Sequence, residues 1–227
     1  MSTLTHYQIF DLLNHPRPLW LVKIDLSDLT LISIDLTGSN LSLSNLSKSD
    51  LNYSILIKCN LSGANLTLAN LFEADLTLAV LNGANLTRAN LTRAILSKCE
   101  MQEAVLVEAN LSRANLTKSN LRGANLSLAI LNRADLSKSD CSGAKFNNAV
   151  LQRANFFEAN LSQASFRNAD LRWTDFTSAN LFKADLTNAN LEGADLTHAI
   201  LDEADMTGVN LEGAILPEST PTRTVIK

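Results

Sequence analysis

A strict period of five residues constrains this chain more than any other feature. Steps of five from Leu26 reach Leu216 without an insertion or deletion and pass through 39 repeat centres. Leu occupies 32 of these centres, and the others are Met, Cys or Phe, so every centre is apolar. The residue two positions earlier is Ala in 26 repeats, and the residue immediately before the centre is Asn or Asp in 27. The repeating unit is therefore Ala-(Asn/Asp)-Leu-(Ser/Thr)-x.

This unit predicts short extended segments separated by corners. Side chains alternate along an extended chain, so the two apolar positions of a unit lie on the same side of it. Because five is odd, the chain must bend after each three-residue strand to keep that side facing inward. A helix is excluded, since apolar spacings of two and three do not follow a 3.6-residue stripe. All eight glycines lie two residues after a centre, where a corner needs permissive backbone angles.

A second period of 20 residues, or four units, indicates the number of sides. Gly63, Gly83, Gly123 and Gly143 repeat at this spacing, and so do groups of arginines and lysines. Residues 20 apart are therefore expected to stack in neighbouring coils, although a recent internal duplication would leave the same spacing. At ~4.8 Å per coil, just under ten four-sided coils form a rod roughly 45 Å long. Inside it, Phe146 is predicted to stack on Phe166, and Phe156 on Phe176.

The repeated unit resembles the motif A(D/N)LXX of the pentapeptide-repeat protein family over residues 24–218. The resemblance implies an all-β fold, a right-handed quadrilateral parallel β-helix, whose hand agrees with the rule for parallel crossovers. It also implies a member of the cyanobacterial type, and most members have no known biochemical activity.

The two ends depart from the repeat. Residues 1–20 are predicted to form a helical cap, with Leu4, Tyr7, Phe10 and Leu13 on its apolar side. Residues 21–218 are predicted to form the β-helix, and residues 219–227 a C-terminal tail. No comparable lid follows Leu216, so we expect either a homodimer through the C-terminal coils or a tail folded across the open end.

Catalytic and metal-binding patterns are missing from the sequence. The three histidines are scattered, and no nucleophile elbow, Walker loop or dinucleotide fingerprint occurs. Cys59 and Cys99 occupy inward small positions and are interpreted as inert fillers. Two stacked pairs, Asp175 with Asp195 and Asp185 with Asp205, could hold a cation, but solvated carboxylates are the favoured interpretation. We therefore predict no enzyme activity, no cofactor and no metal.

Charge and termini restrict the location and the partners. The net charge of −4 and the pI of about 5.4 argue against direct nucleic-acid binding. The first residues lack the basic start and apolar run of a signal peptide, and no stretch is apolar enough to span a membrane. A cytoplasmic protein is expected.

Basic residues gather in the middle of the repeats. From Arg88 to Arg153 there are ten basic and five acidic residues, whereas from Lys183 to Glu218 one lysine faces eight acidic residues. The middle section also carries exposed aromatic candidates, which accompany Arg at interaction hot spots. An ordinary solvated surface, offset by Glu103 and Glu108, is the alternative. The predicted partner-binding residues are Arg93, Arg113, Arg133, Arg153, Lys98, Lys118, Lys138, Phe157 and Trp173.

Two functions follow from these patterns. The first is a non-enzymatic scaffold that binds another protein through the outer faces of the β-helix. The second is a DNA mimic that regulates DNA gyrase, which the resemblance suggests because some family members present a duplex-like acidic rod. The basic middle section departs from that acidic pattern, so the scaffold is favoured.

Overall fold

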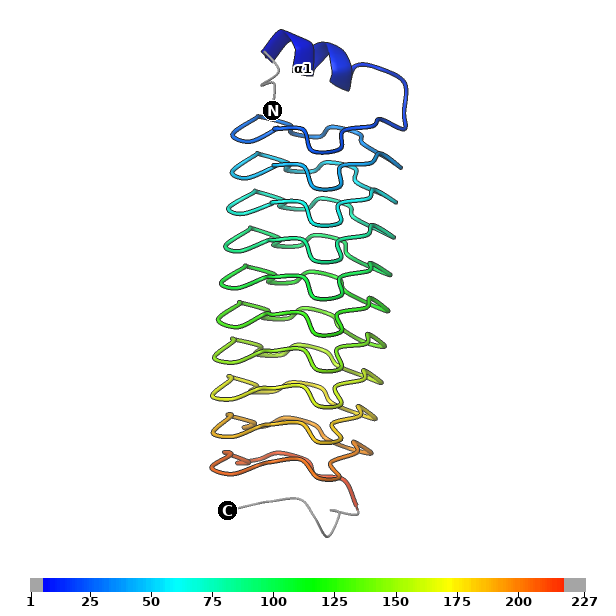
Figure 1. Ribbon diagram of the computed structural model, residues 1–227. Coiled ribbons are helices and arrows are strands. Elements are labelled where there is room, and N and C mark those ends of the chain that lie inside the picture. Colours follow the sequence, from blue (N-terminus) through cyan, green and yellow to red (C-terminus); the bar gives the residue numbers. More distant parts are fainter. Residues whose placement is uncertain (1–5, 219–227) are drawn as a thin grey trace.

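The chain folds into a straight rod of stacked four-sided coils (Figure 1). The computed structural model describes residues 6–218, which comprise helix α1 (His6–Leu13) and the coils that follow it. Parallel bridges join residues 20 apart, from Trp20 with Asn40 to Asp195 with Ile215. The right-handed four-sided parallel β-helix is thus confirmed. The predicted three-residue strands are reduced to single bridge residues, because each corner occupies the rest of its unit.

Each repeat forms the same set of backbone hydrogen bonds. The Ala114 N–H donates to the Leu111 carbonyl across a corner at 3.0 Å, and the Leu111 N–H donates to the Ile130 carbonyl of the next coil at 2.7 Å. The Asn110 N–H donates in the opposite direction along the rod, to the Ala89 carbonyl at 3.0 Å. The parallel stacking therefore satisfies the polar backbone groups that a buried chain must pair.

Every corner has a left-handed residue. The second residue after Leu21, and after each centre from Leu26 to Leu211, has a φ between 52° and 70°. Of these 39 residues, from Lys23 to Gly213, 31 are not glycine. An Asn or Asp side chain supports the corner in many repeats. For example, Asn115 Oδ1 accepts a hydrogen bond from the Thr117 N–H at 3.0 Å. Such Asx turns favour local turn geometry, and they explain the Asn/Asp preference that periodicity alone left unexplained.

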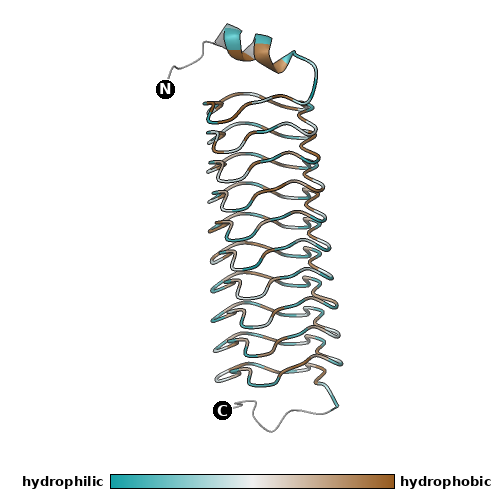
Figure 2. Ribbon diagram, turned by 45° about the vertical axis from the view of Figure 1, so that its right-hand side comes forward, coloured by the Kyte–Doolittle hydropathy of each residue, from teal (hydrophilic) through white to brown (hydrophobic). Residues whose placement is uncertain are grey.

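The interior consists of stacked columns of apolar side chains, and hydrophobic residues recur in every coil (Figure 2). Phe146 stacks on Phe166 with ring centroids 4.8 Å apart, and Phe156 stacks on Phe176 at 5.3 Å. Both predicted stacks are confirmed, and the two columns meet edge to face at 5.8 Å between Phe146 and Phe156.

The three cysteines are buried among these columns. Burial raises the pKa of Cys59, Cys99 and Cys141 to about 12 in each case. A neutral thiol is a poor nucleophile, so the structure agrees with their interpretation as core fillers.

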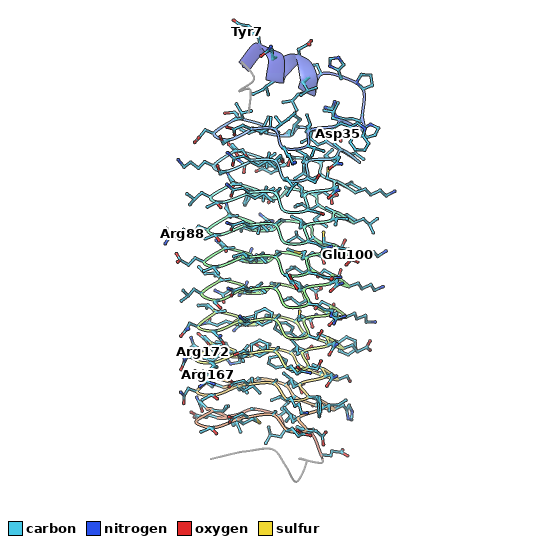
Figure 3. The ribbon with its side chains drawn as sticks, viewed as in Figure 1. Tyr7, Asp35, Arg88, Glu100, Arg167 and Arg172 are labelled. Atoms are coloured by element: carbon cyan, nitrogen blue, oxygen red, sulfur yellow. The ribbon has the colours of Figure 1, made fainter. Side chains whose placement is uncertain are left out.

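Helix α1 lies over the first coil and covers its open end (Figure 1). Ile9 and Leu13 are buried, and Leu12 packs against the same core as Ile24 and Leu29. The placement of Tyr7 on the apolar side is wrong, since it is 89% exposed and points away from the rod (Figure 3). Ile9 and Leu13 are one helical turn apart and share a face, whereas Tyr7 lies about 200° around the helix from Ile9. Leu4 lies outside the described residues, and the Phe10 side chain is not described.

The C-terminal coil is less enclosed than the coils before it. Leu211 and Ala214 are only partly buried, and Ile215 and Leu216 are exposed. The predicted tail, residues 219–227, lies outside the described residues. A homodimer through these coils stays a prediction.

Candidate functional site

The predicted basic residues line two neighbouring corners of the rod. The bridges between residues 20 apart place Arg93, Arg113, Arg133 and Arg153 in one column and Lys98, Lys118 and Lys138 in the column at the next corner. The wall between these corners carries Ile95, Asn115, Asp135 and Asn155. We call this wall and its two basic corners the basic face.

Both ends of the arginine column have partners. Arg93 forms an ion pair with Glu73, with 2.9 Å between Nη1 and Oε1. The Arg153 guanidinium lies 5.3 Å from the centroid of the Trp173 ring. Arg113 and Arg133 lie between these ends and are exposed, and no side chain among the described residues forms an ion pair with either. The centre of the column therefore holds two guanidinium groups available to a partner.

The lysine column is arranged in a similar way. Lys138 contacts Glu158, with 3.5 Å between Nζ and Oε2, and its ammonium lies 5.7 Å from the Phe157 ring. Lys98 and Lys118 are exposed, and neither belongs to an ion pair within residues 6–218. Four basic side chains thus remain unpaired on the basic face: Lys98, Arg113, Lys118 and Arg133.

The acidic residues that offset these columns differ from the expected ones. Glu108 pairs with Arg88 at a different corner, with 2.7 Å between Oε2 and Nε, and this hydrogen bond lowers the pKa of Glu108. The Glu103 side chain leans over Gly123 in another column. Glu73 and Glu158 instead pair with the ends of the two basic columns, because side chains at the corners reach the same corner of a neighbouring coil.

The wall of the basic face has unused hydrogen-bond donors. On the other walls, several asparagines are linked between coils, as where Asn65 Nδ2 donates to Asn45 Oδ1 at 3.1 Å, although Asn85 and Asn125 form no such link within residues 6–218. Asn115 and Asn155 use Oδ1 to accept hydrogen bonds from the backbone of Thr117 and Phe157. In the part of the chain that the structure describes, neither Nδ2 group donates to a neighbouring coil. The basic face therefore offers neutral as well as charged donors.

Trp173 borders the basic face and is held in a defined position. Its ring is contacted by Arg153 and also by Arg172, whose guanidinium lies 5.5 Å from the ring centroid. A methyl group at Gly193 would lie 2.6 Å from Trp173 Cδ1, so glycine makes room for the ring. The side chain is still 43% exposed. The predicted site did not include Arg172 or Gly193, although Gly193 follows Trp173 by one 20-residue period.

Arg172 is itself fixed by an acidic neighbour. Its Nε and Nη2 groups each donate to Asp170 at 2.8 Å. These bonds from Arg172, supported by Gln152 Nε2, hold the pKa of Asp170 below its ordinary value. Arg167 precedes Arg172 by one repeat, and both lie towards the left of the rod in Figure 3. Asp170, Arg172 and Trp173 therefore form a connected group at the end of the basic face.

The C-terminal coils are acidic, and several of their charges are paired. Asp175 bridges to Asp195 and Asp185 to Asp205, as the period predicted. Burial tends to raise the pKa of Asp185, but hydrogen bonds from Thr187 and Arg167 outweigh it and lower the pKa. No group of three metal-ligating side chains occurs among residues 6–218.

An open hollow of about 440 Å³ lies at a corner outside the basic face. It forms where Gly123 and Gly143 carry no side chain, and Glu103, Arg122 and Gln163 line it. The hollow is on the outside of the rod, and the core columns beneath it remain closed. It brings together no predicted site residue.

These features define a solenoid of short parallel bridges, with a packed core and a candidate binding surface on its outside. The family model described as pentapeptide repeats matches in eight copies, which together cover residues 24–63 and 69–216. The chain belongs to the pentapeptide repeat family.

Two solved structures are similar to the whole rod. HetL, a pentapeptide repeat protein involved in heterocyst differentiation regulation in the cyanobacterium Nostoc sp. strain PCC 7120, is 32% identical. The match covers 96% of this chain and 99% of HetL, with a TM-score of 0.55. Trypsin-treated QnrB1, a plasmid-mediated fluoroquinolone resistance protein, is 22% identical over 88% of this chain and 90% of its own, with a TM-score of 0.54. The similarity to QnrB1 concerns the fold alone.

A comparison with curated proteins gives no match. Within residues 6–218, the structure has no helix with the length and hydrophobicity needed to cross a membrane.

Proposed function

We propose that this chain is a non-enzymatic scaffold that binds a partner protein through the basic face. The observation that carries the proposal is the group of four exposed, unpaired cations at two adjoining corners, Lys98, Arg113, Lys118 and Arg133. Elsewhere on the rod, Arg88, Arg167 and Lys183 pair with acidic neighbours. Arg122 and Lys145 form no ion pair among the described residues, but neither has another basic residue 20 positions away. An acidic partner would neutralise charges that the chain itself leaves without a counterion.

The energetics also favour a role in binding. Like charges stacked ~4.8 Å apart repel one another, although water and salt reduce this repulsion. Aromatic side chains beside arginine are common in the residues that dominate protein interfaces. Trp173 and Phe157 lie beside Arg153 and Lys138 at the end of the face. HetL, similar over nearly its full length, is described as involved in regulation, which fits a protein that acts through binding.

A DNA mimic that regulates gyrase is the second candidate, and only the acidic C-terminal coils favour it. Asp175, Asp195 and Glu192 present carboxylates on these coils. The basic face interrupts any continuous negative surface, which opposes duplex mimicry. If this candidate were correct, the chain would inhibit gyrase supercoiling, and neutralisation of Asp195, Asp202 and Asp205 would abolish the inhibition.

Affinity capture with a matched control tests the proposed scaffold. The test variant is Arg113→Ala with Arg133→Ala, and the control is Arg122→Ala with Lys145→Ala, which removes the same charge from other surfaces. All proteins would first be compared by circular dichroism. We expect a partner that wild type and the control retain and the test variant loses. Equal capture by all three proteins would contradict docking on the basic face.

A further inference from the structure

We infer that the partner presents an α-helix that lies along the rod axis on the basic face, and that the contacting side of this helix is apolar at one end and acidic at the other. This inference rests on the proposed function and specifies the chemistry of the partner. It follows from three features of the face: the spacing of its charges, the mixture of its donors and the apolar surface that adjoins it.

The spacing of the basic side chains matches a helix better than a strand. Successive coils place equivalent side chains ~4.8 Å apart along the rod. An α-helix advances ~5.4 Å per turn, so side chains three and four residues apart meet successive coils with a drift of roughly 0.6 Å per coil. Long Arg and Lys side chains can absorb this drift over three or four coils. Same-side residues of a strand recur only every ~6.7 Å.

The donors of the face suit carboxylates. Arg113 and Arg133 offer planar guanidinium groups that bind carboxylates through two hydrogen bonds, and Lys98 and Lys118 line the opposite edge. The Nδ2 groups of Asn115 and Asn155 lie on the wall between these edges. Carboxylates on one side of a helix could therefore contact both basic corners at once.

The same face disfavours an extended phosphate backbone. Asp135 lies on the wall between the two basic corners. Further towards the C-terminus the wall continues with Asp175 and Asp195. A polyanion that followed the rod axis would meet Asp175 and Asp195 as well as Asp135. An acidic segment only a few turns long would meet Asp135 alone and end before the other two. We therefore favour a protein segment over a nucleic acid.

Apolar side chains extend the face towards the N-terminus. Tyr53, Ile55, Leu78 and Ile95 are exposed on the same wall and corners, and they begin on the N-terminal side of the unpaired cations. Glu73 and Asp75 lie among them, and Glu73 is paired with Arg93. Tyr53 also contacts Phe72 edge to face, with ring centroids 5.6 Å apart. The adjoining apolar and basic sections fit a helix whose apolar residues lie at one end and whose acidic residues lie at the other. The apolar end of the helix would therefore lie towards the N-terminal end of the rod, and its acidic end would lie over the unpaired cations.

A designed peptide provides the direct test. The probe is a fluorescent, stapled 18-residue helix, with Leu on one side of its first half and Glu on the same side of its second half; a second probe has the halves exchanged. The control peptide has the same composition, but its Glu and Leu residues are spread around the helix. A DNA duplex of 18 base pairs is the competing ligand. Binding is measured by fluorescence anisotropy at two salt concentrations.

We expect one of the two sided helices to bind wild type and the Arg122→Ala, Lys145→Ala control equally. Its affinity should fall at least tenfold with Arg113→Ala, Arg133→Ala and several-fold with Ile55→Ser, Leu78→Ser. Binding should weaken with salt. The inference would be overturned if neither sided helix bound wild type more tightly than the spread peptide did. It would also be overturned if the DNA duplex bound more tightly than the sided helices.

The outcome can be separated from that of the proposed function. If a protein captured from lysate depends on Arg113 and Arg133 and yet resists displacement by the sided helix, the basic face is a docking surface and only the helical acidic partner is wrong.

Discussion

The side chains in the interior of this rod repeat from coil to coil, whereas those at its corners vary. Inside, the same apolar residue types recur in nearly every coil, and the side chains pack against identical neighbours. At the corners the backbone is equally regular, with 39 left-handed residues spaced five apart from Lys23 to Gly213, but the side chains include Gly, Leu, Glu, Arg, Lys and Trp. Fold and surface chemistry are therefore encoded at different positions of one five-residue unit.

This division follows from the hydrogen bonds. The backbone bonds between coils, together with many Asx turns, hold the corners in place, so the corner side chain contributes little to the fold. A left-handed residue other than glycine costs roughly 1–2 kcal/mol, and the chain accepts this cost at 31 positions. Corner side chains are consequently free to vary, and the basic face is one result.

Adjacent phenylalanines provide the strongest test of this contrast. Phe156 is completely buried and stacks on Phe176, whereas Phe157 lies on the outside beside Lys138. We expect Phe156→Ala to lower the free energy of unfolding by about 3–5 kcal/mol, because it leaves a cavity between stacked coils. Phe157→Ala should change it by about 0.5 kcal/mol, as is usual at a surface. Urea denaturation followed by circular dichroism measures both values. Similar losses of unfolding free energy in the two variants would contradict the separation of fold-determining interior positions from variable surface positions.

Two glycines test whether a corner side chain can matter to its neighbour. Gly143 and Gly193 share nearly the same φ, 66° and 65°, but only Gly193 lies against another side chain, that of Trp173. Gly143→Ala should cost about 1 kcal/mol, from left-handed strain alone. Gly193→Ala should cost about 1 kcal/mol more, because its methyl group displaces the indole.

The same pair gives a spectroscopic readout. In a Trp20→Phe background, in which Trp173 is the remaining tryptophan, Gly193→Ala should change the emission maximum, and Gly143→Ala should leave it unaltered. Equal stability losses without a change in emission would show that Trp173 is not held over Gly193.

The sequence predicted the interior well because its side chains repeat. The four sides, the stacked pairs and the inward cysteines all follow from periods of five and 20 residues, which force equivalent residues into register. The helix over the first coil was also predicted, but its buried side was not. A helix of eight residues can be rotated by the way the following chain enters the first coil, and this rotation places Tyr7 outside.

Periodicity placed the site residues in columns but could not predict their pairing. It gave the two basic corners correctly, yet it did not show that Glu73 and Glu158 pair with their ends or that Arg172 contacts Trp173. These contacts depend on which neighbouring coil each side chain reaches. The unpaired state of Arg113 and Arg133 could be recognised only after those directions were known.

The smallest expected effect concerns Asp170, which binds the Arg172 side chain that contacts Trp173. Hydrogen bonds from Arg172 hold the pKa of Asp170 below its ordinary value. A lowered carboxyl pKa means that the contact is fully formed above the unfolded pKa of ~3.9 and is lost as the pH falls through the folded value. In the Trp20→Phe background, the Trp173 emission should therefore stay constant from pH 7 to about pH 4 and change below it.

Asp170→Asn separates this local event from general acid effects. The variant should show altered emission already at pH 7, because Arg172 loses its charged partner, and it should lack the local acid transition. Asp175→Asn, one repeat further on, should behave as the parent does. Circular dichroism must remain unchanged over the pH range compared, so that unfolding does not contribute. If Asp170→Asn kept the parent's acid transition, Asp170 would not control the position of Trp173, and the end of the basic face would be fixed by Arg153 and Gly193 alone.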